Sequence, residues 1–261
     1  MSEAILLERR GSIAWITFNR PEVGNALDLE MYSTLATLIV EVDRDRDLCS
    51  LVLTGAGGRA FSSGGDIRMF QLPDSTAAVL EYDHLFEAVL QALEACRVPT
   101  IAAVAGPATG GGAALALTCD FRIGSPSARF GFPIARTVGN CLSTPLLARL
   151  VSLLGFARVH DLILTARLVG SNEALSIGLL NEVTLVEESL VPRAEEWARV
   201  LGEQRAPLTL AATREALLRI RRRWLPEGDG NDLLLSCLQS WDFKEGVAAF
   251  LEGRSPRWSG E

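Results

Sequence analysis

The sequence predicts an α/β protein whose first half holds a mostly parallel sheet covered by helices and whose second half is helical. Short apolar runs over residues 50–54 and 100–105 each end at glycine and are typical of buried strands. Segments with helical apolar spacing separate them, and strands joined through helices pair in parallel. After Ser143 the apolar spacing is helical almost throughout.

Composition, net charge and cysteine spacing argue against several classes of protein. The chain has 261 residues, of which 48% are hydrophobic, enough for one large domain or a domain with an appendage. The net charge of -7 argues against general nucleic-acid binding. No apolar run approaches the ~18 residues that span a bilayer, and residues 1–10 lack a secretory pattern, so we expect a cytoplasmic protein. Five cysteines without Cys-x-x-Cys spacing indicate reduced thiols rather than disulfides or a zinc site.

The first half opens with a predicted hairpin over residues 4–8 and 13–18. Asp28 is suited to cap a helix that runs to about Val42, with one apolar face. A helix over 77–93 carries His84, and short strands are predicted over 120–123 and 128–130. Further helices are predicted over 146–154, 157–164, 172–177, 190–201, 208–221, 232–239 and 245–251.

Two glycine bends stand out. The first is Phe-Ser-Ser-Gly-Gly-Asp-Ile over residues 61–67, and the second, over 106–112, joins the strand ending at residue 105 to a small-residue helix. A phosphate loop is excluded at the second bend because Leu115 stands where the third glycine belongs and no lysine follows. The bend is then either an oxyanion site made of backbone N–H groups or a tight turn that needs glycine for its dihedral angles.

An ordered set of motifs resembles the crotonase (enoyl-CoA hydratase/isomerase) superfamily. The motifs are Asn-Arg-Pro at 19–21 with Asn-Ala-Leu at 25–27, the first bend, Pro-Thr-Ile-Ala-Ala-Val at 99–104 leading into Gly-Gly-Gly at 110–112, and Glu-Gly-Val-Ala-Ala-Phe-Leu-Glu at 245–252. The resemblance covers nearly the whole chain, from about Ala4 to Trp258.

The resemblance implies a crotonase-like spiral of ββα units with a C-terminal helical trimerisation region. It implies an α/β core over residues 1–200 and a helical region over 201–261 that packs on the core and on neighbouring subunits of a homotrimer or homohexamer. It also implies an acyl-CoA substrate, with coenzyme A as part of the thioester and no tightly bound cofactor or metal. The backbone N–H groups of Gly65 and Gly111 would then form the oxyanion hole that stabilises an enolate or tetrahedral oxyanion.

The chain departs from the family pattern at the acid/base positions. Family hydratases carry one glutamate two residues after Gly-Gly-Gly and a second just after Phe-x-x-Pro; these positions are Ala114 and Ile134 here. Neither side chain can move a proton, so we do not expect typical hydration. The predicted function is enolate-type acyl-CoA chemistry by a lyase or isomerase. The alternative is a catalytically silent acyl-CoA-binding or assembly subunit.

Four other residues are candidates for the acyl pocket. His84 lies in a region that supplies a catalytic histidine in some relatives, and its alternative is an exposed helix histidine. Arg136 could clamp an acyl carboxylate or face solvent. Asn140 and Cys141 stand near the place where some relatives carry a catalytic aspartate; Cys141 could be a nucleophile, a weak acid or a small buried cysteine.

The resemblance also implies coenzyme A contacts. Arg20 and Ala26 would meet the diphosphate and pantetheine, and the first bend would line the adenine side through Ser62, Ser63, Asp66 and Ile67. Phe250 and Arg254 match the terminal helix of the family. Gly253 falls where relatives often have lysine, so the 3′-phosphate contact is expected to be weaker or moved.

Overall fold

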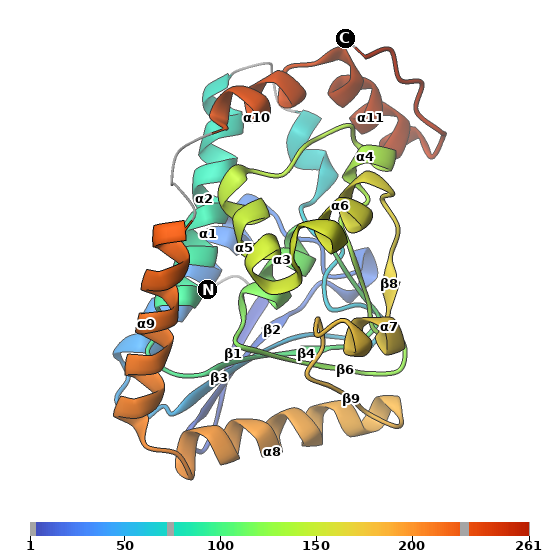
Figure 1. Cartoon of the computed structure of the whole chain (residues 1–261). Coiled ribbons are helices and arrows are strands. Elements are labelled where there is room, and N and C mark those ends of the chain that lie inside the picture. The colour runs from blue at the N-terminus through green and yellow to red at the C-terminus, as the bar shows by residue number, and fades with distance from the viewer. Residues whose placement is uncertain (1–3, 72–75, 225–229, 261) are drawn as a thin grey trace.

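The computed structural model describes residues 4–71, 76–224 and 230–260. Within those ranges a six-stranded sheet runs in the order β1-β2-β3-β4-β6-β9 (Figure 1). Only the β1–β2 pair is antiparallel in this sheet. A second sheet has the order β5-β7-β8. The strands are β1 Ile5–Arg10, β2 Ile13–Phe18, β3 Ser50–Gly55, β4 Thr100–Val104, β5 Pro107–Thr109, β6 Phe121–Gly124, β7 Arg129–Gly131, β8 Val169–Gly170 and β9 Glu182–Val183.

The predicted helices occur in the predicted order, and the short helix α4 is one that the sequence did not predict. They are α1 Leu29–Arg44, α2 Thr76–Ala95, α3 Gly111–Thr118, α4 Ile134–Thr137, α5 Thr144–Leu154, α6 Phe156–Leu164, α7 Ser171–Ser176, α8 Leu190–Glu203, α9 Pro207–Trp224, α10 Asn231–Leu238 and α11 Trp241–Glu252, with 3-10 turns η1 Pro21–Val23, η2 Ile67–Gln71 and η3 Glu187–Ser189. The predicted α/β class with a parallel sheet is confirmed. The second half is not wholly helical: β8 is the last strand of the small sheet, and β9 is the last strand of the large sheet. Each has two residues, which is too short for an apolar period to be detected in the sequence.

Helices cover both faces of the large sheet. On one face α8 packs Ala194 and Ala198 against Trp15, Val52 and Ile101. On the other face α1, α2 and α3 enclose the main core. Figure 1 shows α8 along one side of the sheet and α1, α2, α3 and α5 on the opposite side. Strand β2 is therefore buried on both faces, which explains its nearly continuous apolar sequence.

Helix α1 forms as its sequence indicates. The Asp28 carboxylate accepts a hydrogen bond from the Met31 amide at 2.9 Å and caps the helix. The predicted apolar face is buried: Met31, Leu35, Leu38 and Ile39. The helix thus brings Tyr32, which is fully buried, against α2.

Ion pairs hold α2 in place. Arg149 of α5 reaches Glu87 at 2.5 Å and Glu94 at 2.6 Å, and its own side chain is 9% exposed. Arg221 of α9 also pairs with Glu94. Two cations from different helices therefore fix α2 along two of its turns.

The C-terminal helices close one end of the molecule. A small core joins α10 and α11 to the turn after α4 through Val138, Leu234, Leu238, Phe243 and Val247. Figure 1 shows α10 and α11 at the end opposite α8. The division into a core over 1–200 and a helical region over 201–261 stays a prediction. Within the described ranges, no helix is both long and apolar enough to cross a bilayer.

The loop before α1 depends on one buried side chain. Asn25 has φ +57° and is fully buried. Its side chain accepts from the Arg20 amide at 3.0 Å and donates to the carbonyls of Ala56 at 3.0 Å and Ala60 at 2.8 Å. The side chain therefore ties this loop to the segment that leads into the first bend.

We expect Asn25→Ala to lower the free energy of unfolding by about 2–4 kcal/mol, because it leaves buried backbone groups without partners and strains a positive φ. Urea unfolding followed by circular dichroism measures the loss. Asn25→Gly relieves the strain but not the missing hydrogen bonds, so it should recover only part of the stability. An alanine variant within about 0.5 kcal/mol of wild type would contradict this role.

Candidate functional site

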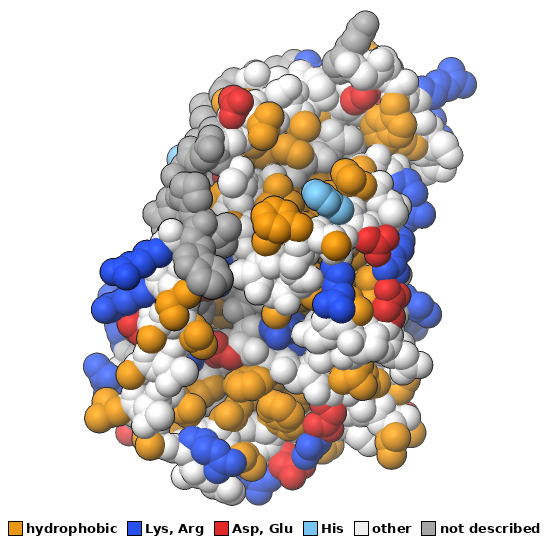
Figure 2. Space-filling view, viewed as in Figure 1, with side chains coloured by type: hydrophobic (Ala, Val, Ile, Leu, Met, Phe, Trp, Pro, Cys, Tyr) orange, Lys and Arg blue, Asp and Glu red, His pale blue; other side chains and the backbone are white. Residues whose placement is uncertain are grey.

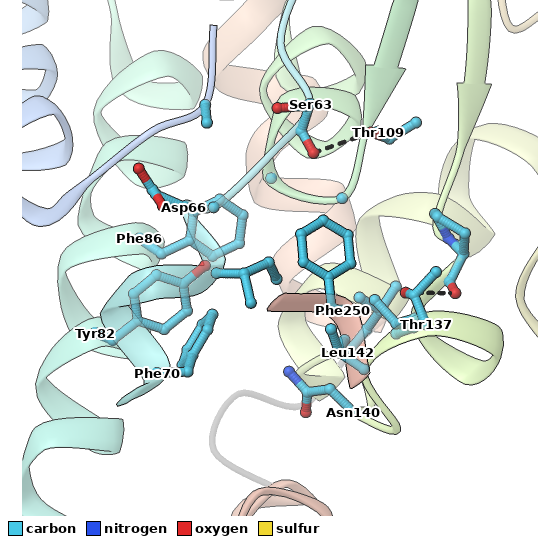
Figure 3. A pocket seen from close by; sticks show the side chains of 18 of the residues that line it. Ser63, Asp66, Phe70, Tyr82, Phe86, Thr109, Thr137, Asn140, Leu142 and Phe250 are labelled. Carbon is cyan, nitrogen blue, oxygen red and sulfur yellow. Dashed lines mark hydrogen bonds between the residues drawn. The ribbon is translucent and has the colours of Figure 1, made fainter. Parts of the chain in front are cut away.

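The two glycine bends lie side by side. Thr109, in the second bend, donates its amide to the Ser62 carbonyl and its hydroxyl to the Ser63 carbonyl, both at 3.0 Å (Figure 3). Gly64 has φ +96°, and a β-carbon there would lie 2.7 Å from the Thr109 oxygen and 3.0 Å from the Gly111 nitrogen. Only glycine permits this approach of the two backbones.

The bends present two backbone donors at one place. The Gly65 amide donates to no described residue, and Gly111 is the first residue of α3, so its N–H has no intrahelical acceptor. A β-carbon on Gly111 would lie 3.6 Å from the Gly65 nitrogen. Two adjacent free N–H groups can stabilise negative charge on one oxygen, which is the chemistry expected of an oxyanion hole.

A cavity of about 470 Å³ adjoins these amides. Its walls are mainly apolar. Figure 3 shows Phe70, Tyr82 and Phe86 along the α2 side of the cavity, and Thr137, Asn140 and Leu142 along the opposite side. Phe250 and Leu251 from α11, with Leu234 and Leu238 from α10, also line it. The cavity suits an acyl chain whose carbonyl reaches the two amides.

Two carboxyl groups line the described part of the cavity, and their surroundings differ. Arg68 and Arg20 donate to Asp66, and the Arg68 contacts lower the pKa of Asp66 to about 2. Asp83 makes no hydrogen bond or ion pair with any described residue. Burial raises the pKa of Asp83, the charge of Glu87 raises it further, and His84 lowers it in part. Asp66 thus stays ionised, whereas Asp83 is suited to exchange a proton.

Comparison with known proteins identifies the family. Residues 8–261 match the family model described as enoyl-CoA hydratase/isomerase. The chain belongs to the enoyl-CoA hydratase/isomerase family. It is 36% identical over 258 residues to the crotonyl-CoA hydratase of Syntrophomonas wolfei, covering 97% of this chain and 96% of that one. It is 33% identical over 254 residues to the short-chain-enoyl-CoA hydratase of Clostridium acetobutylicum, covering 96% and 95%.

A solved structure of the same fold also matches. A methylmalonyl-CoA decarboxylase in complex with 2-nitronate-propionyl-CoA superposes with a TM-score of 0.90 at 25% identity, covering 100% of both chains. The crotonase fold and the membership in an acyl-CoA enzyme family are therefore established for this chain. Its particular reaction depends on the side chains around the cavity.

The two family glutamate positions hold no acid or base in this member of the family. Ile134 lines the cavity, and Ala114 is fully buried in the main core. A replacement acid would therefore have to come from the other walls of the cavity. Asp83 on α2 is the unpaired carboxyl group that the described residues offer there.

Of the four further residues predicted as candidates for the acyl pocket, two line the cavity and two do not. Asn140 and Cys141 line the cavity, as predicted. Burial and the Cys237 thiol raise the pKa of Cys141 to about 12, which disfavours a thiolate nucleophile at this site. His84 and Arg136 are exposed, and neither lines the cavity. The helix phase turns Asp83 inward instead of His84, which periodicity alone did not resolve.

Five of the eight residues predicted to contact coenzyme A line the cavity. Ala26, Ser63, Asp66, Ile67 and Phe250 line the cavity. Ser62 is fully buried; its hydroxyl donates to the Asn25 carbonyl at 2.8 Å and accepts from the Gly64 amide at 3.1 Å. The prediction that Ser62 contacts coenzyme A is therefore corrected, because Ser62 shapes the bend from inside.

The two arginines predicted to contact coenzyme A form ion pairs within the protein. Arg20 pairs with Asp28 and Asp66, each at 3.2 Å, and donates to the Ala26 carbonyl at 3.0 Å. Arg254 is held by Glu245 at 2.6 Å and by Glu252 at 2.5 Å. Their contacts with phosphate groups stay predictions. Among the described residues no cluster of side chains has the composition of a metal site.

Proposed function

We propose that the protein is an acyl-CoA isomerase that moves a carbon–carbon double bond between the β,γ and α,β positions of a thioester. The Gly65 and Gly111 amides polarise the carbonyl. The Asp83 carboxylate removes a proton from the α carbon, and the electron pair moves onto the carbonyl oxygen to form an enolate. The same carboxyl group then returns the proton to the γ carbon. The observation that carries the proposal is the unpaired, partly buried Asp83 on the wall of this cavity.

One carboxyl group suffices for this reaction because the proton that leaves is the proton that returns. Hydration needs a second group to position and activate water, and both family positions for it are vacant at Ala114 and Ile134. Isomerisation thus fits the side chains better than hydration does.

Decarboxylation fits less well. A substrate carboxylate would lie in an apolar cavity near the Asp83 carboxyl, and Arg68, a cation at the wall, is already paired with Asp66 at 2.6 Å. A substrate carboxylate that has no free cation as its partner is disfavoured in such a cavity.

The test offers purified protein trans-3-hexenoyl-CoA, crotonyl-CoA and methylmalonyl-CoA. We expect conversion of the first to its conjugated isomer, seen by ultraviolet absorbance and mass spectrometry, at a rate at least tenfold above any change of the others. Release of carbon dioxide from methylmalonyl-CoA would favour a decarboxylase. Tight binding of all three without conversion would favour the silent subunit.

The partner is proposed to be further copies of the same chain, in a homotrimer or homohexamer. Large apolar side chains that one chain leaves exposed include Phe156 at 69%, Leu164 at 74% and Leu208 at 85%. Figure 2 shows several groups of exposed hydrophobic side chains on the face in view. Such surfaces are typical of buried contacts between subunits. Light scattering after size-exclusion chromatography should give the mass of three or six chains, and a monomer would contradict the proposal.

A further inference from the structure

The two tyrosines of the chain meet beside the glycine amides. The sequence contains two tyrosines, Tyr32 on α1 and Tyr82 on α2, 50 positions apart. Their rings pack edge to face with centroids 5.8 Å apart. A β-carbon on Gly65 would lie 3.0 Å from the Tyr82 hydroxyl oxygen and 3.7 Å from that of Tyr32. A β-carbon on Gly111 would lie 2.7 Å from the Tyr32 hydroxyl. Both hydroxyls therefore lie against the residues that supply the amides.

The Tyr32 hydroxyl is buried, and no described group meets it at full hydrogen-bond geometry. The polar group that faces it is the Tyr82 hydroxyl: in addition to burial, their contact raises the pKa of Tyr32, and it opposes the rise at Tyr82, as expected of a Tyr32 donor and a Tyr82 acceptor. The other described side-chain atoms of this kind, Trp15 Nε1 and Ser50 Oγ, belong to strands β2 and β3 and do not line the cavity. Because Tyr82 accepts from Tyr32, its own hydroxyl proton is left to donate toward the cavity.

The Tyr82 side chain lines the cavity (Figure 3), whereas Tyr32 is not one of the lining residues. Burial raises the pKa of Tyr82 to about 12 and that of Tyr32 well above its ordinary value, so both phenols stay protonated. Each can then donate a hydrogen bond throughout the physiological pH range. A buried tyrosine donor at an enolate oxygen is an established way to stabilise such an intermediate.

We propose that Tyr82 donates a third hydrogen bond to the thioester oxygen, and that the buried Tyr32 hydroxyl holds Tyr82 in position by donating to its oxygen. Tyr82 is then a catalytic residue and Tyr32 a positioning residue. Neither transfers a proton: the Asp83 carboxylate takes the α proton, the electron pair moves to the carbonyl oxygen, and three donors share the resulting charge. This inference deepens the proposed function and rests on it for the identity of the base.

The experiment uses the full chain with butyryl-CoA carrying a ¹³C-labelled carbonyl. Difference infrared spectroscopy measures the carbonyl stretch of the bound thioester, which falls as donors polarise it. Exchange of the α protons in deuterated water, followed by NMR, measures enolate formation in the same complex. We compare wild type with Tyr82→Phe, Tyr32→Phe and the double variant.

We expect Tyr82→Phe to move the stretch back toward the value in water and to slow exchange on the order of 10²-fold, the usual effect of removing one such donor. Tyr32→Phe should do the same in part, with exchange slowed about tenfold. The double variant should be no slower than Tyr82→Phe, because the two residues act as a unit. A Tyr82→Phe protein with the wild-type stretch and exchange within twofold of wild type would overturn the proposal.

Two controls separate the possible failures. Asp83→Asn should keep the wild-type carbonyl stretch while it abolishes exchange; if it leaves exchange intact, the proposed base is wrong but the tyrosine assignment is still testable by the stretch. Tyr32→Phe should unfold at a temperature slightly below wild type, because it removes the hydrogen bond to Tyr82, and it should also move the carbonyl stretch toward its value in water. A purely structural Tyr32 would lose stability and leave the stretch unchanged.

The small number of tyrosines gives a direct readout of the pair. Protein grown with 3-fluorotyrosine carries fluorine at two positions, and each Tyr→Phe variant assigns one ¹⁹F signal. Butyryl-CoA should shift the Tyr82 signal, and the Tyr32 signal by a smaller amount, whereas free coenzyme A should shift neither. Equal shifts with free coenzyme A would contradict contact with the acyl carbonyl.

Discussion

Gly111→Pro is expected to lower isomerase turnover by about 10²–10³-fold, because proline removes one of the two N–H groups that we propose to hold the carbonyl oxygen. The helix itself should tolerate the change, since Gly111 is the first residue of α3 and proline is favoured at that position. Steady-state kinetics with trans-3-hexenoyl-CoA measures the loss, which should fall on kcat more than on KM.

Gly111→Ala is the matched control. It keeps the N–H group but places a β-carbon 2.7 Å from the Tyr32 hydroxyl, as proline also does. The alanine variant therefore reports the steric effect, and the additional loss with proline reports the amide. Equal activity of the two variants would remove the Gly111 amide from the mechanism. Circular dichroism and coenzyme A binding confirm that each variant is folded.

Asp83→Asn is expected to lower turnover by about 10³-fold or more, because the amide has the size of the carboxylate but cannot take a proton. The binding of butyryl-CoA should change by less than about threefold, since Asp83 makes no hydrogen bond or ion pair with the described residues whose loss would disturb the cavity. Asp83→Glu keeps the acid and should retain more activity than the asparagine variant. Full activity of Asp83→Asn would require another proton carrier.

The pH dependence follows from the same residue. Asp83 must be ionised to accept the α proton, and burial together with Glu87 raises its pKa above the ordinary aspartate value, with a partial opposing effect of His84. The groups near it also include Tyr82 and the Cys141 thiol, both protonated at neutral pH. Turnover should therefore fall as pH decreases through this raised pKa, at a higher pH than an exposed aspartate would give. A profile that is flat down to pH 4 would contradict the assignment.

The sequence predicted the strand and helix order because most elements carry their own signals. Asp28 caps α1, and the apolar runs of β3 and β4 end at glycine bends. The position of Gly65 beside Gly111 could be expected as well, since both bends follow parallel strands of one fold. These features depend on local chemistry and on topology, which the order of residues records.

The α2 side of the cavity could not be predicted in this way. His84 and Asp83 are adjacent in sequence, and the rotation of the helix alone decides which of them lines the cavity. The contact between Tyr32 and Tyr82 joins two helices whose mutual distance no local pattern encodes. Likewise Ser62 reads as a surface serine in a bend, but its hydrogen bonds to Asn25 and Gly64 bury it.

The ion pairs behind α2 have an evolutionary consequence. Arg149 and Arg221 anchor the helix through Glu87 and Glu94, in the turns that follow the one carrying Tyr82 and Asp83. Substitutions at Tyr82 and Asp83 therefore leave these anchors in place, while the Gly65 and Gly111 amides come from a different part of the chain. A lineage built on this scaffold can change the bond it makes or breaks by altering a few side chains on one helical turn.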